Sequence, residues 1–226
     1  MQKYLLRFAL KIPLQSPTLM HVDTLAFLGD VKTGATIDQG AGNDSVFFGT
    51  ASSLTGTTLT GSGADTFHLQ GANTAVFGAL STAGSQVSFG SGADMATFTG
   101  AIGAGSIYGG TGADTLDFNA AVGAATVDSG AGADSFNFAA AVGAASIDAG
   151  VGADTLTFTG AVTGATVSGL DDSGDVASLS GTNTLVFSSV GTGAQVSFGT
   201  GADMATFSGA VGAGSIYGGT GADTLD

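Results

Sequence analysis

The sequence predicts an all-β protein, a parallel β-roll or β-solenoid with about 20 residues per coil, and three observations support this fold class. A short motif recurs along the chain at a nearly constant spacing. Between its copies, apolar and polar residues alternate over four or five positions, as in strands that bury one face. The chain also contains 40 glycines and 15 phenylalanines, which suits closely spaced turns around an aromatic core.

The recurring motif is G-x-G-x-D. Its copies end at Asp44, Asp65, Asp94, Asp114, Asp134, Asp154, Asp203 and Asp223, and degenerate copies end at Asp23 and Asp175. The period is nearly constant, except that the intervals from Asp65 to Asp94 and from Asp175 to Asp203 are longer. We interpret this pattern as a coil of about 20 residues that is lengthened twice by roughly eight or nine. A longer repeat is superimposed on it, because residues 86–117 return almost unchanged as 195–226.

One coil contains two predicted strands and two turns. In residues 114–118, the apolar side chains of Leu116 and Phe118 alternate with polar ones, which indicates a strand with one buried face. Val127 marks the second strand of the same coil. Gly123 lies in one turn, and the G-x-G-x-D loop forms the other. Each strand is therefore expected to pair in parallel with its equivalents in the next coils, around a ladder of phenylalanines.

The charges of this chain are distributed unevenly. The net charge is −14, all four basic residues lie in the first 32 positions, and all 18 acidic residues are aspartates. This balance predicts no nucleic-acid partner, since nucleic-acid binding requires a basic surface. The absence of cysteine excludes disulfides and thiolate metal sites. No run of about 18 apolar residues occurs, so we expect no transmembrane segment.

Stacking the coils creates an electrostatic problem. Equivalent aspartates in neighbouring coils would lie about 4.8 Å apart. At that separation two unit charges repel by about 1 kcal/mol in water and by about 3.5 kcal/mol at an effective dielectric constant of 20. From residue 33 onward the chain has 16 aspartates and no lysine or arginine to offset this repulsion. A divalent cation between coils would offset the repulsion. Calcium fits this position because it accepts six to eight oxygen ligands, which such loops offer.

At these residues the chain resembles the repeats-in-toxin (RTX) family, whose nonapeptide is G-G-x-G-x-D-x-U-x with U a large apolar residue. Residues 109–117 and 218–226, both GGTGADTLD, match it at every specified position, and six further loops keep G-x-G-x-D. The resemblance covers roughly residues 36–226. It implies a parallel β-roll in which each calcium ion lies between two consecutive loops, held by aspartate carboxylates and loop carbonyls.

Transferred to this chain, the resemblance assigns calcium ligands at eleven positions. They are the carboxylates of Asp44, Asp65, Asp94, Asp114, Asp134, Asp154, Asp203 and Asp223, and carbonyls such as those of Gly109, Thr111 and Ala113.

The chain departs from the family in its second turn. This turn reads AAVGAA or AIGAG and lacks a carboxylate, so we expect one calcium-loop edge and one apolar edge. Asp175, in LDDSGD, has lost the G-x-G frame and is expected either to bind differently or to be an outlier. Asp128 is expected to face solvent from a strand rather than to act as an auxiliary ligand. His68 is expected on the outward side of its strand, and His21 has no partner cluster, so neither is expected to have a role.

Residues 1–19 are expected to form a cap or a docking segment that precedes the solenoid at 20–226. Two local structures fit this segment. Alternating apolar residues from Tyr4 to Ile12 fit a strand, whereas the spacing of Lys3, Arg7 and Lys11 fits a helix with a basic stripe. Because Arg7 and Lys11 interrupt the apolar stretch, we do not expect a cleaved signal peptide.

The resemblance implies type I secretion and folding outside the cell, where calcium is millimolar. We expect an extracellular or cell-surface structural protein, namely a repeat of a surface layer, filament or large adhesin, with possible contact to cell surface or matrix. Alternatives are the repeat region of a secreted toxin or hydrolase, and an ice-binding solenoid. No catalytic constellation is recognisable, so an enzyme is not expected. The basic N-terminal segment and the acidic last coil predict head-to-tail self-association.

Overall fold

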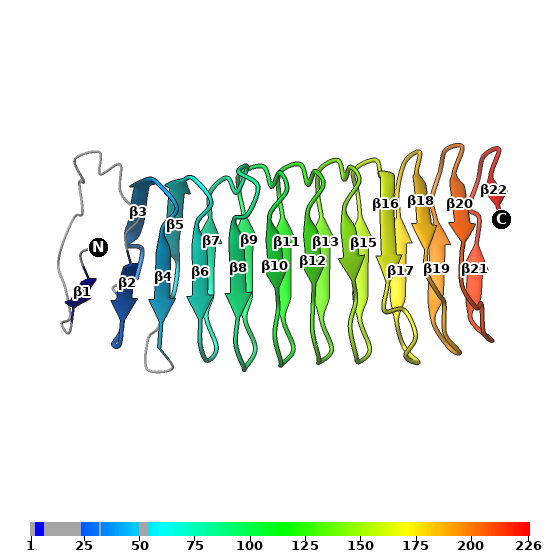
Figure 1. Cartoon of the computed structure of the whole chain (residues 1–226). Coiled ribbons are helices and arrows are strands. Elements are labelled where there is room, and N and C mark those ends of the chain that lie inside the picture. The colour runs from blue at the N-terminus through cyan, green and yellow to red at the C-terminus, as the bar shows by residue number, and fades with distance from the viewer. Residues whose placement is uncertain (1–2, 7–23, 32, 50–53) are drawn as a thin grey trace.

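A computed structural model describes residues 3–6, 24–31, 33–49 and 54–226, and within these ranges the regular structure consists of strands only. The chain winds into a stack of coils, each giving one strand to each of two facing sheets (Figure 1). Every strand pairing in both sheets is parallel, and the register places Thr115 beside Ser135 and Ser135 beside Thr155 in successive coils. The predicted parallel β-solenoid is confirmed, and its period is the predicted one, since equivalent loop aspartates such as Asp114 and Asp134 are 20 positions apart.

The 12-stranded sheet contains, in spatial order, β1 (Lys3–Leu6), β2 (Thr24–Phe27), β4 (Ser45–Phe48), β6 (Thr66–Leu69), β8 (Gln86–Phe89), β10 (Ser106–Tyr108), β12 (Thr126–Asp128), β14 (Ser146–Asp148), β16 (Thr163–Ser168), β18 (Thr184–Phe187), β20 (Met204–Phe207) and β22 (Thr224–Leu225). The 10-stranded sheet contains β3 (Thr36–Ala41), β5 (Thr57–Ser62), β7 (Thr74–Phe77), β9 (Met95–Phe98), β11 (Thr115–Phe118), β13 (Ser135–Phe138), β15 (Thr155–Phe158), β17 (Val176–Leu179), β19 (Gln195–Phe198) and β21 (Ser215–Tyr217).

The two sheets run in opposite directions, which gives the solenoid two long edges. We call the edge where strands of the 12-stranded sheet begin the upper edge, and the edge where strands of the 10-stranded sheet begin the lower edge, as they lie in Figure 1. A loop that precedes β11 therefore lies on the lower edge, and a loop that precedes β20 lies on the upper edge.

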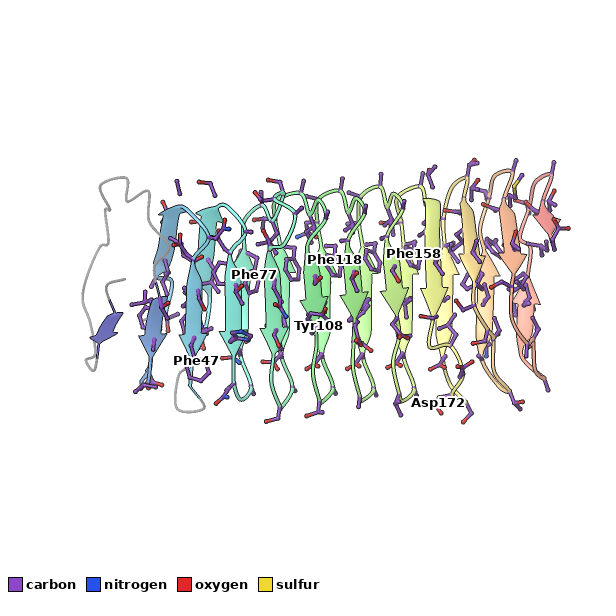
Figure 2. All side chains as sticks on the ribbon, in the orientation of Figure 1. Phe47, Phe77, Tyr108, Phe118, Phe158 and Asp172 are labelled. Carbon is purple, nitrogen blue, oxygen red and sulfur yellow. The ribbon has the colours of Figure 1, made fainter. Side chains whose placement is uncertain are left out.

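The core is the predicted aromatic ladder. On β11, Leu116 and Phe118 are buried while Thr115 and Asp117 face outward, as the alternation requires. Five phenylalanines from successive coils stack ring on ring, with centroids 5.0, 4.9, 4.6 and 4.7 Å apart, and three of them are labelled in Figure 2. They are Phe77, Phe98, Phe118, Phe138 and Phe158. Each ring therefore holds two neighbouring coils in register.

Replacing Phe118 with Ala is expected to cost about 4 kcal/mol of unfolding free energy, because the cavity removes stacking contacts with Phe98 and Phe138. Denaturant titration in saturating calcium measures this loss. The matched control is Thr115→Ala on the outer face of the same strand, where we expect less than about 0.5 kcal/mol. Equal losses for the two variants would contradict the assigned inner face.

The two long intervals between motifs are not lengthened coils, and this part of the sequence interpretation is wrong. Asp65 precedes β6, and the next strand of that sheet, β8, follows after one ordinary coil, since Thr66 pairs with Gln86. Asp94 instead precedes β9 of the opposite sheet. The interval from Asp65 to Asp94 is thus one and a half coils. The interval from Asp175 to Asp203 returns the motif to the first sheet in the same way.

The duplicated block shows the same exchange of sheets. Residues 86–117 and 195–226 differ only at 91/200, 99/208 and 102/211. Yet the sequence QVSF forms β8 of the 12-stranded sheet in the first copy and β19 of the 10-stranded sheet in the second. MATF forms β9 and β20, again in opposite sheets. Nearly identical segments therefore occupy opposite faces of the solenoid.

Part of the N-terminal segment is a strand. Lys3–Leu6 forms β1, and Tyr4 pairs in parallel with Leu25 of β2, so these four residues follow the strand alternative rather than the helical one. The remainder of residues 1–19, together with His21 and Asp23, lies outside the described residues. A search of the described chain for a helix long and apolar enough to cross a membrane found none.

Candidate metal site

The motif aspartates form three runs that alternate between the two edges. Asp44 and Asp65 precede β4 and β6 and lie on the upper edge. The second run lies on the lower edge, and the third returns to the upper edge. The second run consists of Asp94, Asp114, Asp134, Asp154 and Asp175, and the third of Asp203 and Asp223. The prediction of a single calcium-loop edge is therefore wrong, because both half-coil shifts move the loops across the solenoid.

Each aspartate carboxylate contacts the loop of the preceding coil. The backbone N–H of Asp114 donates to Oδ1 of Asp134 at 2.8 Å, and that of Asp134 donates to Oδ1 of Asp154 at 2.7 Å. The same bond joins six consecutive pairs: 44/65, 94/114, 114/134, 134/154, 154/175 and 203/223. The structure therefore brings all eight predicted aspartates into such pairs and adds Asp175 to them.

These carboxylates are buried. The exposed fraction is 1% for Asp114, 3% for Asp134 and 1% for Asp154. Their second oxygens, Oδ2, are buried and accept no hydrogen bond, and the same holds for Asp94 and Asp203. The Ser129 hydroxyl, beside Asp134, donates to the carbonyl of Ala149 instead. A buried carboxylate oxygen without a donor is unfavourable, so each of these atoms calls for a proton or a cation.

Burial changes the acidity of the runs. It raises the pKa of Asp94, Asp114 and Asp154 to about 6, because the charged form loses its hydration. Burial also raises the pKa of Asp65, Asp134 and Asp175. For Asp114, repulsion from Asp134 and Asp94 adds to the effect of burial on the pKa. Without a cation, burial therefore disfavours the charged form of these carboxylates, and Asp94, Asp114 and Asp154 take up protons as the pH falls through about 6.

The glycines of the loop allow consecutive loops to stack directly. Gly112, Gly132 and Gly152 have φ of 134°, 151° and 136°, a region that side chains disfavour. A Cβ on Gly132 would lie 1.6 Å from the carbonyl oxygen of Gly112 in the loop of the preceding coil. Position 109 also requires a small residue, since a Cβ there would lie 3.2 Å from Oδ2 of Asp114 and 2.2 Å from the Ser129 carbonyl oxygen. The first Gly of the motif thus leaves space beside the unpaired carboxylate oxygen.

The loop carbonyls have mixed roles. The Thr111 carbonyl, a predicted ligand, accepts a hydrogen bond from the N–H of Gly92 at 2.7 Å, within a ladder that joins consecutive loops. The predicted carbonyls of Gly109 and Ala113 belong to the same loop. No three His, Cys, Asp or Glu side chains converge anywhere in the part of the chain that the structure describes. A cation between two coils would therefore need two carboxylates completed by loop carbonyls, a donor set of oxygens that fits calcium.

Replacing Gly132 with Ala is expected to destabilise the fold by more than about 3 kcal/mol, because the added methyl group would overlap backbone that cannot move aside. The control is Gly143→Ala in the opposite turn, where the nearest atom would be 3.6 Å away and φ is ordinary. Thermal melts in calcium compare the two variants. A Gly132 variant as stable as the Gly143 variant would show that the loops are not tightly stacked.

Among the stacked loop positions that form the columns, sequence reasoning misjudged one member and missed three. Asp175 is fully buried and its Oδ1 accepts the N–H of Asp154 at 2.9 Å, so it belongs to the run. It differs from the inner aspartates in one respect, because its Oδ2 accepts the N–H of Asp172 at 2.8 Å. Asn73, Ser85 and Asn183 occupy column positions without a carboxylate. The available signal was the apolar residue four positions later, as in Phe77 after Asn73. Figure 2 labels Asp172, whose N–H donates to Asp175, at the lower edge.

The outward-facing residues are placed as predicted. His68 is exposed on β6, and Asp128 is half-buried on the outer face of β12. Asp128 lies beside Asp148 of the next coil, and burial together with this neighbour raises its pKa. Neither His68 nor Asp128 belongs to a run.

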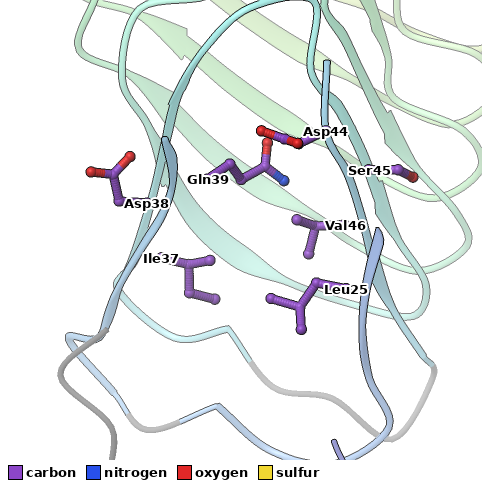
Figure 3. Close-up of a pocket in the computed structure, with 7 residues that line it drawn as sticks. All are labelled: Leu25, Ile37, Asp38, Gln39, Asp44, Ser45 and Val46. Atoms are coloured by element: carbon purple, nitrogen blue, oxygen red, sulfur yellow. The ribbon is translucent and has the colours of Figure 1, made fainter. Parts of the chain in front are cut away.

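A small hollow lies beside the first described loop (Figure 3). Gln39 takes the place of the first Gly of the motif, and its side-chain amide is buried between Asp38 and Asp44. Leu25, Ile37, Ser45 and Val46 form the remaining walls. This loop thus differs from the loops that precede Asp114 and Asp223, whose equivalent positions 109 and 218 are glycine.

The raised pKa values predict that acid stabilises the cation-free protein. A carboxylate whose pKa is higher in the folded than in the unfolded chain stabilises the fold when protonated. This contribution is complete below the unfolded pKa of about 4, and it is lost as pH rises through the folded pKa of about 6. Thermal melts of the calcium-free chain between pH 4 and pH 8, with sucrose added to populate the folded state, are therefore expected to show a falling midpoint as the pH rises. A midpoint that rises with pH would contradict the burial of these carboxylates.

No protein-family model matches the chain, and comparisons with curated proteins and with solved structures found no match. We therefore infer the function from the geometry and chemistry of the aspartate runs.

Proposed function

We propose that the chain is a calcium-stabilised structural repeat protein that folds outside the cell. The supporting observation is that the aspartate runs contain buried Oδ2 atoms without a hydrogen-bond donor. The chain has no lysine or arginine after residue 32 to neutralise them. Calcium would lie between consecutive loops, held by the carboxylates of each pair and by loop carbonyls. When bound, the ion supplies the positive charge that offsets repulsion between the coils.

The extracellular location follows from this calcium requirement. Loops of this kind gain stability only where the free calcium concentration exceeds the dissociation constant. Millimolar calcium outside the cell meets that condition, and the RTX resemblance supplies a matching route, type I secretion of the unfolded chain. The elongated stack of coils fits a surface layer, a filament or the stalk of a large adhesin, in contact with a cell surface or matrix (Figure 1). This role includes no catalysis.

Head-to-tail association is part of the proposal. In the described chain, β21 and β22 each pair with a strand on one side only. On these two strands, the side chains of Tyr217 and Leu225 are exposed, with exposed fractions of 55% and 40%. A further coil would cover these side chains and pair the free backbone groups, whether it comes from the same polypeptide or from a second copy.

Calcium counting tests the proposal. Equilibrium dialysis with radioactive calcium is expected to find six ions in the described part of the chain, one for each pair of consecutive aspartates. Magnesium at the same concentration is expected to displace few of them, because it disfavours such flexible oxygen sites. A folded chain that binds no calcium would make the proposal wrong, and the buried carboxylates would then be protonated.

A further inference from the structure

Asparagine begins each run that follows a half-coil shift. Asn73 lies one coil before Asp94 on the lower edge, and Asn183 lies one coil before Asp203 on the upper edge. Both are buried, with exposed fractions of 3% and 0%. Each uses its backbone N–H as the aspartates do, donating to Oδ1 of the following Asp at 2.6 and 2.8 Å. The two asparagines therefore occupy true column positions.

The side-chain amides of both asparagines donate hydrogen bonds to oxygen atoms of two consecutive loops. Nδ2 of Asn73 donates to the carbonyl of Gly71 at 2.6 Å and to Oδ1 of Asp94 at 3.0 Å. Nδ2 of Asn183 donates to the carbonyl of Gly181 at 3.0 Å and to Oδ1 of Asp203 at 2.9 Å. A third, longer contact in each case reaches the carbonyl three residues earlier. Each amide nitrogen is thus surrounded by carbonyl oxygens of its own loop and a carboxylate oxygen of the next.

This environment is the one that a cation between two loops would have. Loop carbonyls and a carboxylate from the following coil are oxygen ligands of the kind that calcium takes. An amide NH₂ offers two donors and no net charge, and it satisfies the same oxygens by hydrogen bonding. Oδ2 has no donor at Asp94 and Asp203, just as at the inner aspartates. The difference lies at Oδ1, which accepts an amide N–H from the asparagine at these two interfaces, whereas in the Asp–Asp pairs no side-chain amide donates to it. The difference recurs on opposite edges and at two separate junctions.

We propose that the amides of Asn73 and Asn183 take the place of a cation at the first interface of their runs. The 73/94 and 183/203 interfaces then bind no ion and hold together without one. Cations are restricted to the Asp–Asp interfaces, in separate groups of one, four and one along the chain. This inference rests on the proposed calcium binding, and it assigns to the two asparagines the function of limiting each group.

The test converts the amide into a carboxylate. Asn73→Asp removes the donor and supplies a second carboxylate, so we expect seven bound calcium ions by equilibrium dialysis in place of six, and Asn183→Asp gives the same increase. The matched control is Asn137→Asp on the outer face of β13, which makes the same chemical change outside the columns and is expected to leave six ions. In chelator at neutral pH, with trimethylamine N-oxide added to populate the folded state, the two column variants are expected to melt at lower temperature than the Asn137 variant, because they add an unpaired buried charge.

The outcomes separate this inference from the proposed function. A wild-type chain that binds no calcium overturns the proposed function and this inference with it. Six ions in the wild type and six in a folded Asn73→Asp or Asn183→Asp variant overturn only the role of the amides. Asn73→Ala serves where the Asp variants fail to fold. It removes the amide without adding a ligand and is expected to lower the melting midpoint in chelator with trimethylamine N-oxide added, whereas an unchanged midpoint overturns the inference.

Discussion

Removal of calcium is expected to unfold most of the chain at neutral pH. In excess chelator the far-UV circular dichroism should lose its β signal, and millimolar calcium should restore it cooperatively. The physical reason is the repeated pairing of ionised carboxylates in neighbouring coils without basic partners. There are six such pairs, and all their members are buried except Asp223, which is half-buried. Each pair alone opposes folding by about 1 to 3.5 kcal/mol, which together exceeds the stability of many domains.

The control for this experiment is the far-UV circular dichroism spectrum of the calcium-free chain at pH 4. Protonation neutralises the runs, so acid is expected to restore part of the β signal that calcium restores at neutral pH. A β spectrum that excess chelator leaves unchanged at pH 8 would show that the solenoid needs no cation. Sodium chloride at matched ionic strength excludes simple screening as the cause of the calcium effect.

Replacing Asp134 with Asn is expected to have opposite effects with and without calcium. Asp134 belongs to the 114/134 and 134/154 pairs, in the middle of the longest run. In calcium the variant weakens two sites, and we expect a loss of about 5 kcal/mol if calcium is near 100 times the dissociation constant of each. In chelator the variant is expected to be more stable than the wild type, because Asn retains an Oδ1 acceptor and removes one of the repelling charges.

Thermal melts in the two conditions measure this change of sign, with trimethylamine N-oxide added in chelator to populate the folded state. Asp128→Asn is the control, since Asp128 lies on the outer face of β12 and outside the runs. It is expected to change the midpoint in calcium far less than Asp134→Asn does. If Asp134→Asn is stabilising in both conditions, the column is a ladder of protonated carboxylates. If both variants weaken calcium binding equally, Asp128 is also a ligand.

The local rules of one coil could be predicted from the sequence. Alternation at Leu116 and Phe118 identified the buried face of β11, and the regular spacing of the motif identified which strands pair. The repeat of Asp at the same position predicted that the carboxylates would meet in consecutive coils, as Asp114 and Asp134 do. These features depend on residues close in sequence and on a constant period, so no long-range information was required.

The edge on which each G-x-G-x-D loop lies was decided only by the tertiary structure. QVSF at 86–89 and at 195–198 is the same sequence, yet it lies in opposite sheets. The reason is that both sheets are parallel and bury the same kind of face, so a shift of half a coil leaves every local environment nearly unchanged. The long interval that ends at Asp94 therefore reads equally well as a lengthened coil or as one and a half coils. Only the strand pairing of the whole stack distinguishes these two interpretations. The same pairing determines where Asn73, Asp175 and Asn183 lie.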